Sequence, residues 1–146
     1  MLKGIHPLLH ADLLHVLASM GHGDELVIAD ANFPSATNGK RLVQLPASST
    51  TVALEAILTL LPIDASATPP AMTMKVPGDA ADLLEPTREF AAVLARIDPP
   101  VAAIGLERHD FYARARNAFA VVRTAELRRF ANVILVKGVV SRYPPA

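Results

Sequence analysis

The sequence predicts an α/β fold with a largely parallel sheet. Short apolar runs, which are typical of strands, alternate along the chain with segments whose apolar residues recur at helical spacing. Residues 26–29 form an unbroken apolar run, which suits a strand that is buried on both faces, as in a parallel sheet. The 12 prolines mostly mark the ends of these segments and indicate short, ordered loops. Such alternation is typical of sheets whose strands are joined through helices.

The first elements surround a glycine-rich turn. Apolar residues at helical spacing predict a helix over residues 11–20, for which Gly21 would supply a left-handed cap. Gly23 allows a second sharp turn, which leaves His22 between two glycines with little side-chain cover. A strand over about residues 25–29 follows. After this strand comes a polar segment, which we expect to be a loop as far as residue 40.

The later elements follow from their boundaries. Ser48 and Ser49 supply N-cap oxygens for a helix over about residues 51–61, which Pro62 stops. A second helix begins near Pro86 and ends before the pair Pro99–Pro100, and Asp110 could cap a short third helix through Asn117. A turn is expected at Pro77-Gly78-Asp79. The remaining strands are expected at residues 41–45, 71–76, 101–106, 118–123 and 132–136.

Composition narrows the class of protein. A chain of 146 residues fits one domain, and with 51% apolar and 19% charged residues it leaves apolar surface for contacts between subunits. Zero formal charge and the lack of a basic stripe argue against nucleic-acid binding. The absence of cysteine excludes disulfides, thiolate catalysis and sulfur-ligated metals. No run reaches the roughly 20 apolar residues of a membrane span, and no signal peptide is supported, so we expect a cytoplasmic protein.

The common cofactor motifs are missing. Gly21 and Gly23 follow a predicted helix rather than a strand, and no third glycine stands at the dinucleotide-binding spacing. Neither a phosphate-binding Walker loop nor a G-x-S-x-G nucleophile motif occurs. His6 and His10 have the spacing of two metal ligands on a helix, but Pro7 disfavours helix there and no acidic partner completes a set. The natural enzymatic interpretation is therefore acid–base chemistry on a small polar molecule, without cofactor or metal.

His22 and Asp30 are the first candidates for such chemistry. The unperturbed pKa of histidine lies near neutrality, so His22 could transfer protons, although it could equally bond a backbone carbonyl and pack the turn. Asp30 follows a strand, where ligands of α/β sheets collect, and could accept two sugar hydroxyls or simply cap the next turn. A strand separates its ends by roughly 17–20 Å, so a bent entry loop or a neighbouring subunit must bring these two groups together if they serve one site.

Two further candidates lie at the ends of later strands. Arg108 belongs to a charged run after a predicted strand; it could hydrogen-bond adjacent hydroxyls through its fork of donors, or the run could be a solvated surface. Asn132 enters the last strand and offers a donor and an acceptor side by side, which match a hydroxyl. Tyr112 and Phe119 could be core or interface aromatics.

Together these pieces resemble the RbsD/FucU family of sugar mutarotases. The resemblance covers nearly the whole chain in order: MGHGDE at residues 20–25, DANFP at 30–34, FYARA at 111–115, and FANVIL with KGV at 130–139. It is closer to the L-fucose mutarotase branch than to the D-ribose pyranase branch. The features that favour the fucose branch are Phe33–Pro34, Pro69–Pro70 before Met72-Thr73-Met74, the turn Val76-Pro77-Gly78-Asp79, and Arg108 where the ribose branch typically has histidine.

The resemblance implies a three-layer α/β/α fold with a mostly parallel, mixed sheet of about six strands, and cofactor-independent interconversion of sugar anomers. By position, His22 matches the family's proton donor. Positions that bind the sugar are matched by Asp30, Arg108, Phe130, Ala131 and Asn132. The family implies a ring-like homodecamer with its sites at subunit boundaries, a monosaccharide as the substrate, and no metal.

One position departs from the family. Tyrosine is usual where this chain has Phe130, whose ring can stack on a sugar face but cannot hydrogen-bond or relay a proton. This difference bears on turnover and on sugar preference. Two alternatives to an L-fucose mutarotase therefore remain open. One is a D-ribose pyranase-type activity, and the other is a monosaccharide-binding protein without catalysis.

Overall fold

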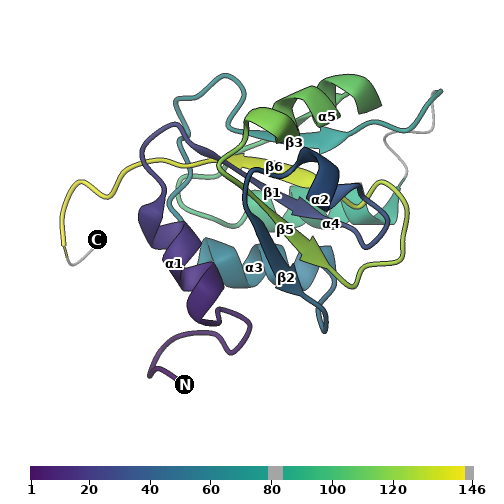
Figure 1. The fold of residues 1–146 in the computed structure, drawn as a ribbon. Helices are drawn as coiled ribbons and strands as arrows, with labels where there is room; N and C mark the ends of the chain where they lie inside the picture. Colours follow the sequence, from purple (N-terminus) through teal and green to yellow (C-terminus); the bar gives the residue numbers. More distant parts are fainter. Residues whose placement is uncertain (79–83, 144–146) are drawn as a thin grey trace.

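The computed structural model describes residues 1–78 and 84–143 and contains a six-stranded mixed sheet (Figure 1). Its strands are β1 (Glu25–Ala29), β2 (Leu42–Leu45), β3 (Ala71–Met74), β4 (Ala103–Leu106), β5 (Ala120–Thr124) and β6 (Val133–Val136). Their order across the sheet is β2-β5-β1-β6-β3-β4. The last strand, β6, is antiparallel to both of its neighbours, β1 and β3, whereas the other pairs are parallel.

Helices cover both faces of this sheet, which confirms the three-layer α/β/α fold (Figure 1). The helices are α1 (Ala11–Ser19), α2 (Ser35–Asn38), α3 (Thr50–Leu58), α4 (Glu85–Leu94) and α5 (Arg108–Asn117). The first core cluster joins α1, α3 and α4 to one face, and the second joins Phe111 and Ala115 of α5 to the other. None of the helices in the described ranges is long and apolar enough to cross a membrane.

The strand directions bring several loops together at one end of the sheet. Because β1 to β5 all run the same way, their carboxyl ends lie at a common edge, and the antiparallel β6 begins there. The central strand β1 is buried from Leu26 to Ala29, as the apolar run predicts. This edge therefore holds Asp30, the start of α5 and the loop from β5 to β6, which is the expected place for a site.

Local predictions were confirmed at two helix starts. The Ser49 side chain caps α3 by accepting a hydrogen bond from the Val52 amide at 3.3 Å, which satisfies one of the free amides of the first turn. Pro86 lies in the first turn of α4, where a backbone N–H would have no hydrogen-bond partner within the helix. In the glycine-rich turn, Gly23 has φ +84°, a conformation that glycine adopts without steric penalty.

Three local predictions were wrong. Gly21 does not take a left-handed cap: α1 ends at Ser19, Met20 is extended, and the Gly21 amide instead donates to the Asp24 carboxylate at 2.7 Å. The expected polar loop contains the short helix α2, in which the Asn38 side chain bonds the Pro34 carbonyl. The third helix begins at Arg108, so Asp110 lies in its first turn and is no cap. Asp79 of the expected turn lies outside the described residues.

Candidate functional site

A pocket of about 350 Å³ lies at the carboxyl-end edge of the sheet. Several elements build it, because the ends of β1, β3 and β4 and the start of β6 meet there. Its lining residues are Asp30, Asn32, Phe33, Met74, Arg108, Tyr112, Arg129, Phe130 and Asn132.

Asp30 and Asn132 are joined in a buried polar pair. Their exposed fractions are 4% and 2%. The Asp30 amide donates to Asn132 Oδ1 at 2.8 Å, and Asn132 Nδ2 donates back to Asp30 Oδ2 at 3.0 Å. Asp30 Oδ1 accepts from the amides of Asn32 and Phe33 at 2.9 and 2.8 Å, so this carboxylate also caps the turn after β1. Buried polar groups need such partners, and this pair fixes the end of β1 against the start of β6.

The hydrogen bonds leave little capacity for a ligand. A carboxylate has about four acceptor positions, and three of those on Asp30 are taken. The pair therefore offers one acceptor on Asp30 and one N–H of Asn132, rather than the two acceptor positions expected for Asp30 from the sequence. Burial raises the pKa of the Asp30 carboxyl above its usual value, while the hydrogen bonds from Asn32, Asn132 and Phe33 oppose that rise. One donor beside one acceptor suits a hydroxyl.

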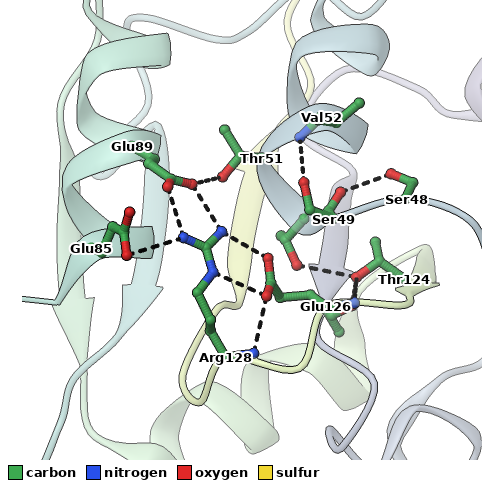
Figure 2. Close-up of polar contacts among 11 residues, drawn as sticks. Ser48, Ser49, Thr51, Val52, Glu85, Glu89, Thr124, Glu126 and Arg128 are labelled. Atoms are coloured by element: carbon green, nitrogen blue, oxygen red, sulfur yellow. Dashed lines mark hydrogen bonds and ion pairs between the residues drawn. The ribbon is translucent and has the colours of Figure 1, made fainter.

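The loop from β5 to β6 is held by an ion-pair network around Arg128, which we call the Arg128 network (Figure 2). Arg128 makes paired hydrogen bonds to Glu89 of α4 at 2.7 and 3.0 Å, and to Glu126 at 3.0 and 2.8 Å. Thr51 of α3 also bonds Glu89. The Glu126 carbonyl accepts from the Ala31 amide at 2.8 Å. The loop is thus tied to α4 and to the segment after β1, and the two residues that follow Arg128 line the pocket.

Aromatic and apolar side chains form the rest of the pocket wall. Phe33 makes edge-on contacts with Phe111 and Tyr112, with ring centroids 5.8 and 5.4 Å apart. Phe130 is half-buried, and its backbone has φ +60°, a region that bulky residues rarely adopt. Such strain persists only where the surroundings enforce it, and it is concentrated at functional sites. Apolar side chains beside the polar Asp30–Asn132 pair suit a sugar ring, which has hydroxyls on its edge and C–H groups on its faces.

His22 lies at the other edge of the sheet. Its Nε2 is 2.8 Å from Asp64 Oδ2, and 60% of its side chain is exposed. The backbone of its loop is paired with the end of β6, since the Gly23 amide donates to the Lys137 carbonyl at 2.8 Å. Hydrogen bonds from Ser66 and His22 lower the pKa of Asp64 to about 2, so this carboxylate is charged at neutral pH. The predicted exposure of His22 is confirmed, and its partner is a carboxylate rather than a backbone carbonyl.

The structure thus unites most of the candidates within one chain. Asp30, Arg108, Phe130 and Asn132 line the pocket, and Ala131 is buried between the last two. His22 does not line it. His6 is exposed and bonds the Leu8 amide, and the described residues hold no group of three metal-binding side chains.

Sequence reasoning missed Asp64 and gave no role to Arg129. Asp64 could not be found because no pattern links it to His22, 42 residues away. Arg129 had a signal, since it directly precedes three predicted site residues, Phe130, Ala131 and Asn132.

A pocket at the carboxyl ends of the strands, whose buried pair offers one donor and one acceptor, defines a small α/β protein suited to a polyhydroxylated molecule. The family model described as the RbsD / FucU transport protein family matches residues 3–140. The chain therefore belongs to the RbsD/FucU family.

Similar proteins cover nearly the same length. An L-fucose mutarotase of Haemophilus influenzae (strain 86-028NP) is 44% identical over 95% of this chain and 97% of its own. The fucose mutarotase of Streptococcus pneumoniae, solved in complex with L-fucose, is 36% identical over 95% of this chain and 99% of its own, with a TM-score of 0.86. The FucU structure from Bifidobacterium longum is 41% identical over 94% and 99%, with a TM-score of 0.87.

Proposed function

We propose that this protein is a cofactor-independent mutarotase that interconverts the α and β anomers of a monosaccharide, with L-fucose as the best candidate. The observation that carries the proposal is the Asp30–Asn132 pair, which presents one acceptor and one donor to the pocket that Arg108 also lines. The similarity to L-fucose mutarotases over 95% of the chain supports the choice of sugar.

The reaction needs only proton transfer. Ring opening requires a proton at the ring oxygen and removal of one from the anomeric hydroxyl, and closure on the other face of the carbonyl reverses both. His22 is the proposed acid–base group. Asp30 and Arg108 orient hydroxyls, and Asn132 holds another. Phe130 packs on the sugar face, and Ala131 fixes the backbone between the ring and the amide. A positioned acid or base contributes about 10²–10⁴-fold, which suffices because anomers already interconvert unaided.

The proposed site contains residues from two subunits. His22 and Asp30 flank β1 at opposite edges of the sheet, so His22 of a neighbouring copy would complete the pocket. The assembly we propose is a homodecamer in the cytoplasm, with sites at the subunit boundaries. Exposed apolar side chains support an assembly: 48% of Ile104 on the edge strand β4 and 77% of Leu127 in the β5–β6 loop are accessible.

Saturation-transfer NMR tests this function directly. The protein should accelerate anomeric exchange of L-fucose, and His22→Ala should remove most of the acceleration, by about 10²–10⁴-fold. His15→Ala, which changes an exposed histidine of α1 outside the pocket, is the matched control and should leave the rate unchanged. Absence of acceleration with fucose, ribose and galactose alike would refute a mutarotase. Faster exchange of ribose than of fucose would instead indicate a pyranase-type activity.

A second candidate is a sugar-binding protein without catalysis, which the missing hydroxyl at Phe130 favours. Calorimetry would then show sugar binding while exchange rates stay at their unaided values. Appearance of exchange in Phe130→Tyr would identify the ring hydroxyl as the missing group. Rapid exchange by the wild-type protein excludes this candidate.

A further inference from the structure

A buried hydroxyl is joined to the Asp30–Asn132 pair through a single peptide bond. It belongs to Thr124 at the end of β5, which is buried and does not line the pocket. Thr124 Oγ donates to the Ala29 carbonyl at 2.9 Å, and this carbonyl shares its peptide unit with the Asp30 amide. That amide in turn donates to Asn132 Oδ1 at 2.8 Å. One peptide unit therefore connects a threonine outside the pocket to the asparagine inside it.

The direction of these hydrogen bonds is fixed by the groups that make them. The Glu126 amide can only donate, and it donates to Thr124 Oγ at 3.2 Å. The Ala29 carbonyl can only accept, so the hydroxyl proton of Thr124 points to it. The Asp30 amide can only donate, so the Asn132 atom beside it is the oxygen, and Nδ2 lies at the Asp30 carboxylate. This chain of bonds leaves the second N–H of Asn132 Nδ2 for a ligand.

A second buried hydroxyl contacts Thr124 but lies outside this chain. Thr50, at the start of α3, is fully buried, and its Oγ is 3.2 Å from Thr124 Oγ. Because the one hydroxyl proton of Thr124 goes to Ala29, Thr50 must be the donor in this contact. Loss of the Thr50 hydroxyl would remove one bond to Thr124 and leave every later bond of the chain in place. Thr50 is therefore a matched control for Thr124.

The end of β5 also holds the backbone that follows Asp30. The Glu126 carbonyl accepts from the Ala31 amide at 2.8 Å, so the residues before and after Asp30 are both bonded to this strand end. Figure 2 shows Thr124 beside Glu126, with the amide of Glu126 bonded to the threonine oxygen. Hydrogen bonds in series polarise one another, so a peptide whose carbonyl accepts a bond donates more strongly through its N–H. Thr124 should therefore strengthen the bond from the Asp30 amide to Asn132.

We propose that Thr124 is a positioning residue for sugar binding, which acts through the Ala29–Asp30 peptide to fix the orientation of Asn132. The inference rests on the proposed function for the identity of the ligand as a sugar and for the role of Asn132 in holding a hydroxyl. The effect of Thr124 should appear mainly in the affinity for the sugar. A hydroxyl held by Asn132 is bound before and during ring opening alike, and such uniform binding lowers KM without changing kcat.

Three variants test this role. Thr124→Val replaces the hydroxyl by a methyl group of similar size, Thr124→Ser keeps the hydroxyl, and Thr50→Val removes only the neighbouring hydroxyl. Calorimetry gives the affinity for L-fucose, and saturation-transfer NMR gives the exchange rate as a function of sugar concentration. Thr124→Val should weaken binding about 10-fold, as for loss of one oriented hydrogen bond, and change the maximal rate by less than about 3-fold. Thr124→Ser and Thr50→Val should bind within about 3-fold of the wild type, because both keep the chain intact.

The Asp30 amide gives a second readout that needs no sugar. Its proton resonance should move upfield in Thr124→Val, because a proton in a weaker hydrogen bond is more shielded. Thr124→Ser and Thr50→Val should leave the resonance in place. Both valine variants lose a buried hydrogen bond, so a general loss of stability is common to them and cannot explain a difference between them. If Thr124→Val does not fold, Thr124→Cys replaces it and should give a smaller change in the same direction, since a thiol is a weaker donor.

The outcomes separate this inference from the proposed function. Unchanged affinity for L-fucose in the Thr124 variant overturns the inference, and so does an equal loss in Thr50→Val. Either result is compatible with rapid exchange by the wild-type protein, which would still support the mutarotase. Weaker binding and a shifted Asp30 resonance in the Thr124 variant alone support the positioning role, even where the wild-type protein accelerates no exchange and the mutarotase is refuted. If the wild-type protein binds no sugar, an Asp30 resonance that stays in place in the Thr124 variant overturns the inference.

Discussion

The contact between His22 and Asp64 determines which imidazole nitrogen is available. Asp64 stays ionised at neutral pH because hydrogen bonds from Ser66 and His22 lower its pKa to about 2. An ionised carboxylate accepts a hydrogen bond, so neutral His22 carries its proton on Nε2 toward Asp64 and presents Nδ1 as a base. Asp64 thereby acts as a positioning residue for the proposed proton transfer.

Replacement of Asp64 by Asn should slow exchange by about 10-fold or more, less than His22→Ala, because the amide no longer fixes the imidazole tautomer. Ser66→Ala is the matched control, since it removes another partner of Asp64 and keeps the contact with His22. Exchange rates between pH 5 and 9 measure the effect. A profile for Asp64→Asn that superimposes on the wild type would contradict a positioning role.

The same depressed pKa has a consequence for folding. A carboxyl whose pKa is lower in the folded state stabilises the protein above its unfolded value, here 3.8. That contribution is lost as the pH falls from about 4 toward 2.

At the scale of single elements, the Arg128 network determines where the β5–β6 loop lies. Glu126 is 6% exposed, and the pKa of both Glu126 and Glu89 is lowered mainly by hydrogen bonds from Arg128. Loss of the guanidinium would leave a buried carboxylate without its partner, which is more costly than loss of an exposed ion pair.

Arg128→Met should therefore lower the free energy of unfolding by about 1–3 kcal/mol at pH 7 and weaken sugar binding, because Phe130 and Asn132 follow in the same loop. The stabilisation depends on ionised glutamates, so the difference from wild type should shrink as the pH falls below 4.5, the ordinary pKa of glutamate. Urea unfolding at pH 7 and at pH 4 measures it. Arg96→Met, which opens an exposed pair, should change the free energy by less than about 1 kcal/mol. Equal effects of the two variants would contradict the special role of Arg128.

The elements themselves were largely predictable from the sequence. Apolar runs and proline boundaries located all six strands and four of the helices, because these patterns reflect which residues are buried. The short helix α2 was missed since it depends on hydrogen bonds rather than on apolar spacing, such as that from Asn38 Nδ2 to the Pro34 carbonyl. The direction of β6 could not be read from its composition. An apolar strand reads the same in parallel and antiparallel pairings.

The pocket was predictable only in part, because some of its contacts join segments that are far apart in the sequence. Asp30 was predicted because ligands collect at strand ends in such sheets, and the pairing of β1 with β6 brings Asn132 within hydrogen-bonding distance of it. The contacts of Asp64 with His22 and of Arg128 with Glu89 join segments far apart in sequence. They follow from three-dimensional packing, which no local pattern encodes.

For the whole molecule, the decisive feature is that the pocket and His22 occupy opposite edges of one sheet. A mixing experiment tests whether two subunits share a site. His22→Ala and Arg108→Met each remove one half of the proposed site, and Arg108 is exposed, so its loss spares the buried Asp30–Asn132 pair. Either variant alone should show little exchange activity. Subunit exchange at a 1:1 ratio should restore about a quarter of the wild-type activity, because that share of random interfaces pairs two intact halves.

Native mass spectrometry provides the control by showing that mixed oligomers have formed. Mixed oligomers that stay inactive would show that each site is built from a single chain.

The placement of His22 and Asp30 on either side of one five-residue strand also has a stoichiometric consequence. If His22 of one copy meets Asp30 of another, the contact joins two different parts of the surface, so every copy can act as a donor at one and as a receiver at the other. A linear row of such copies always has a receiver with no donor at one terminus and a donor with no receiver at the other. Only a row that closes into a ring lets every copy contribute both its His22 and its pocket. A closed ring therefore has as many complete sites as chains.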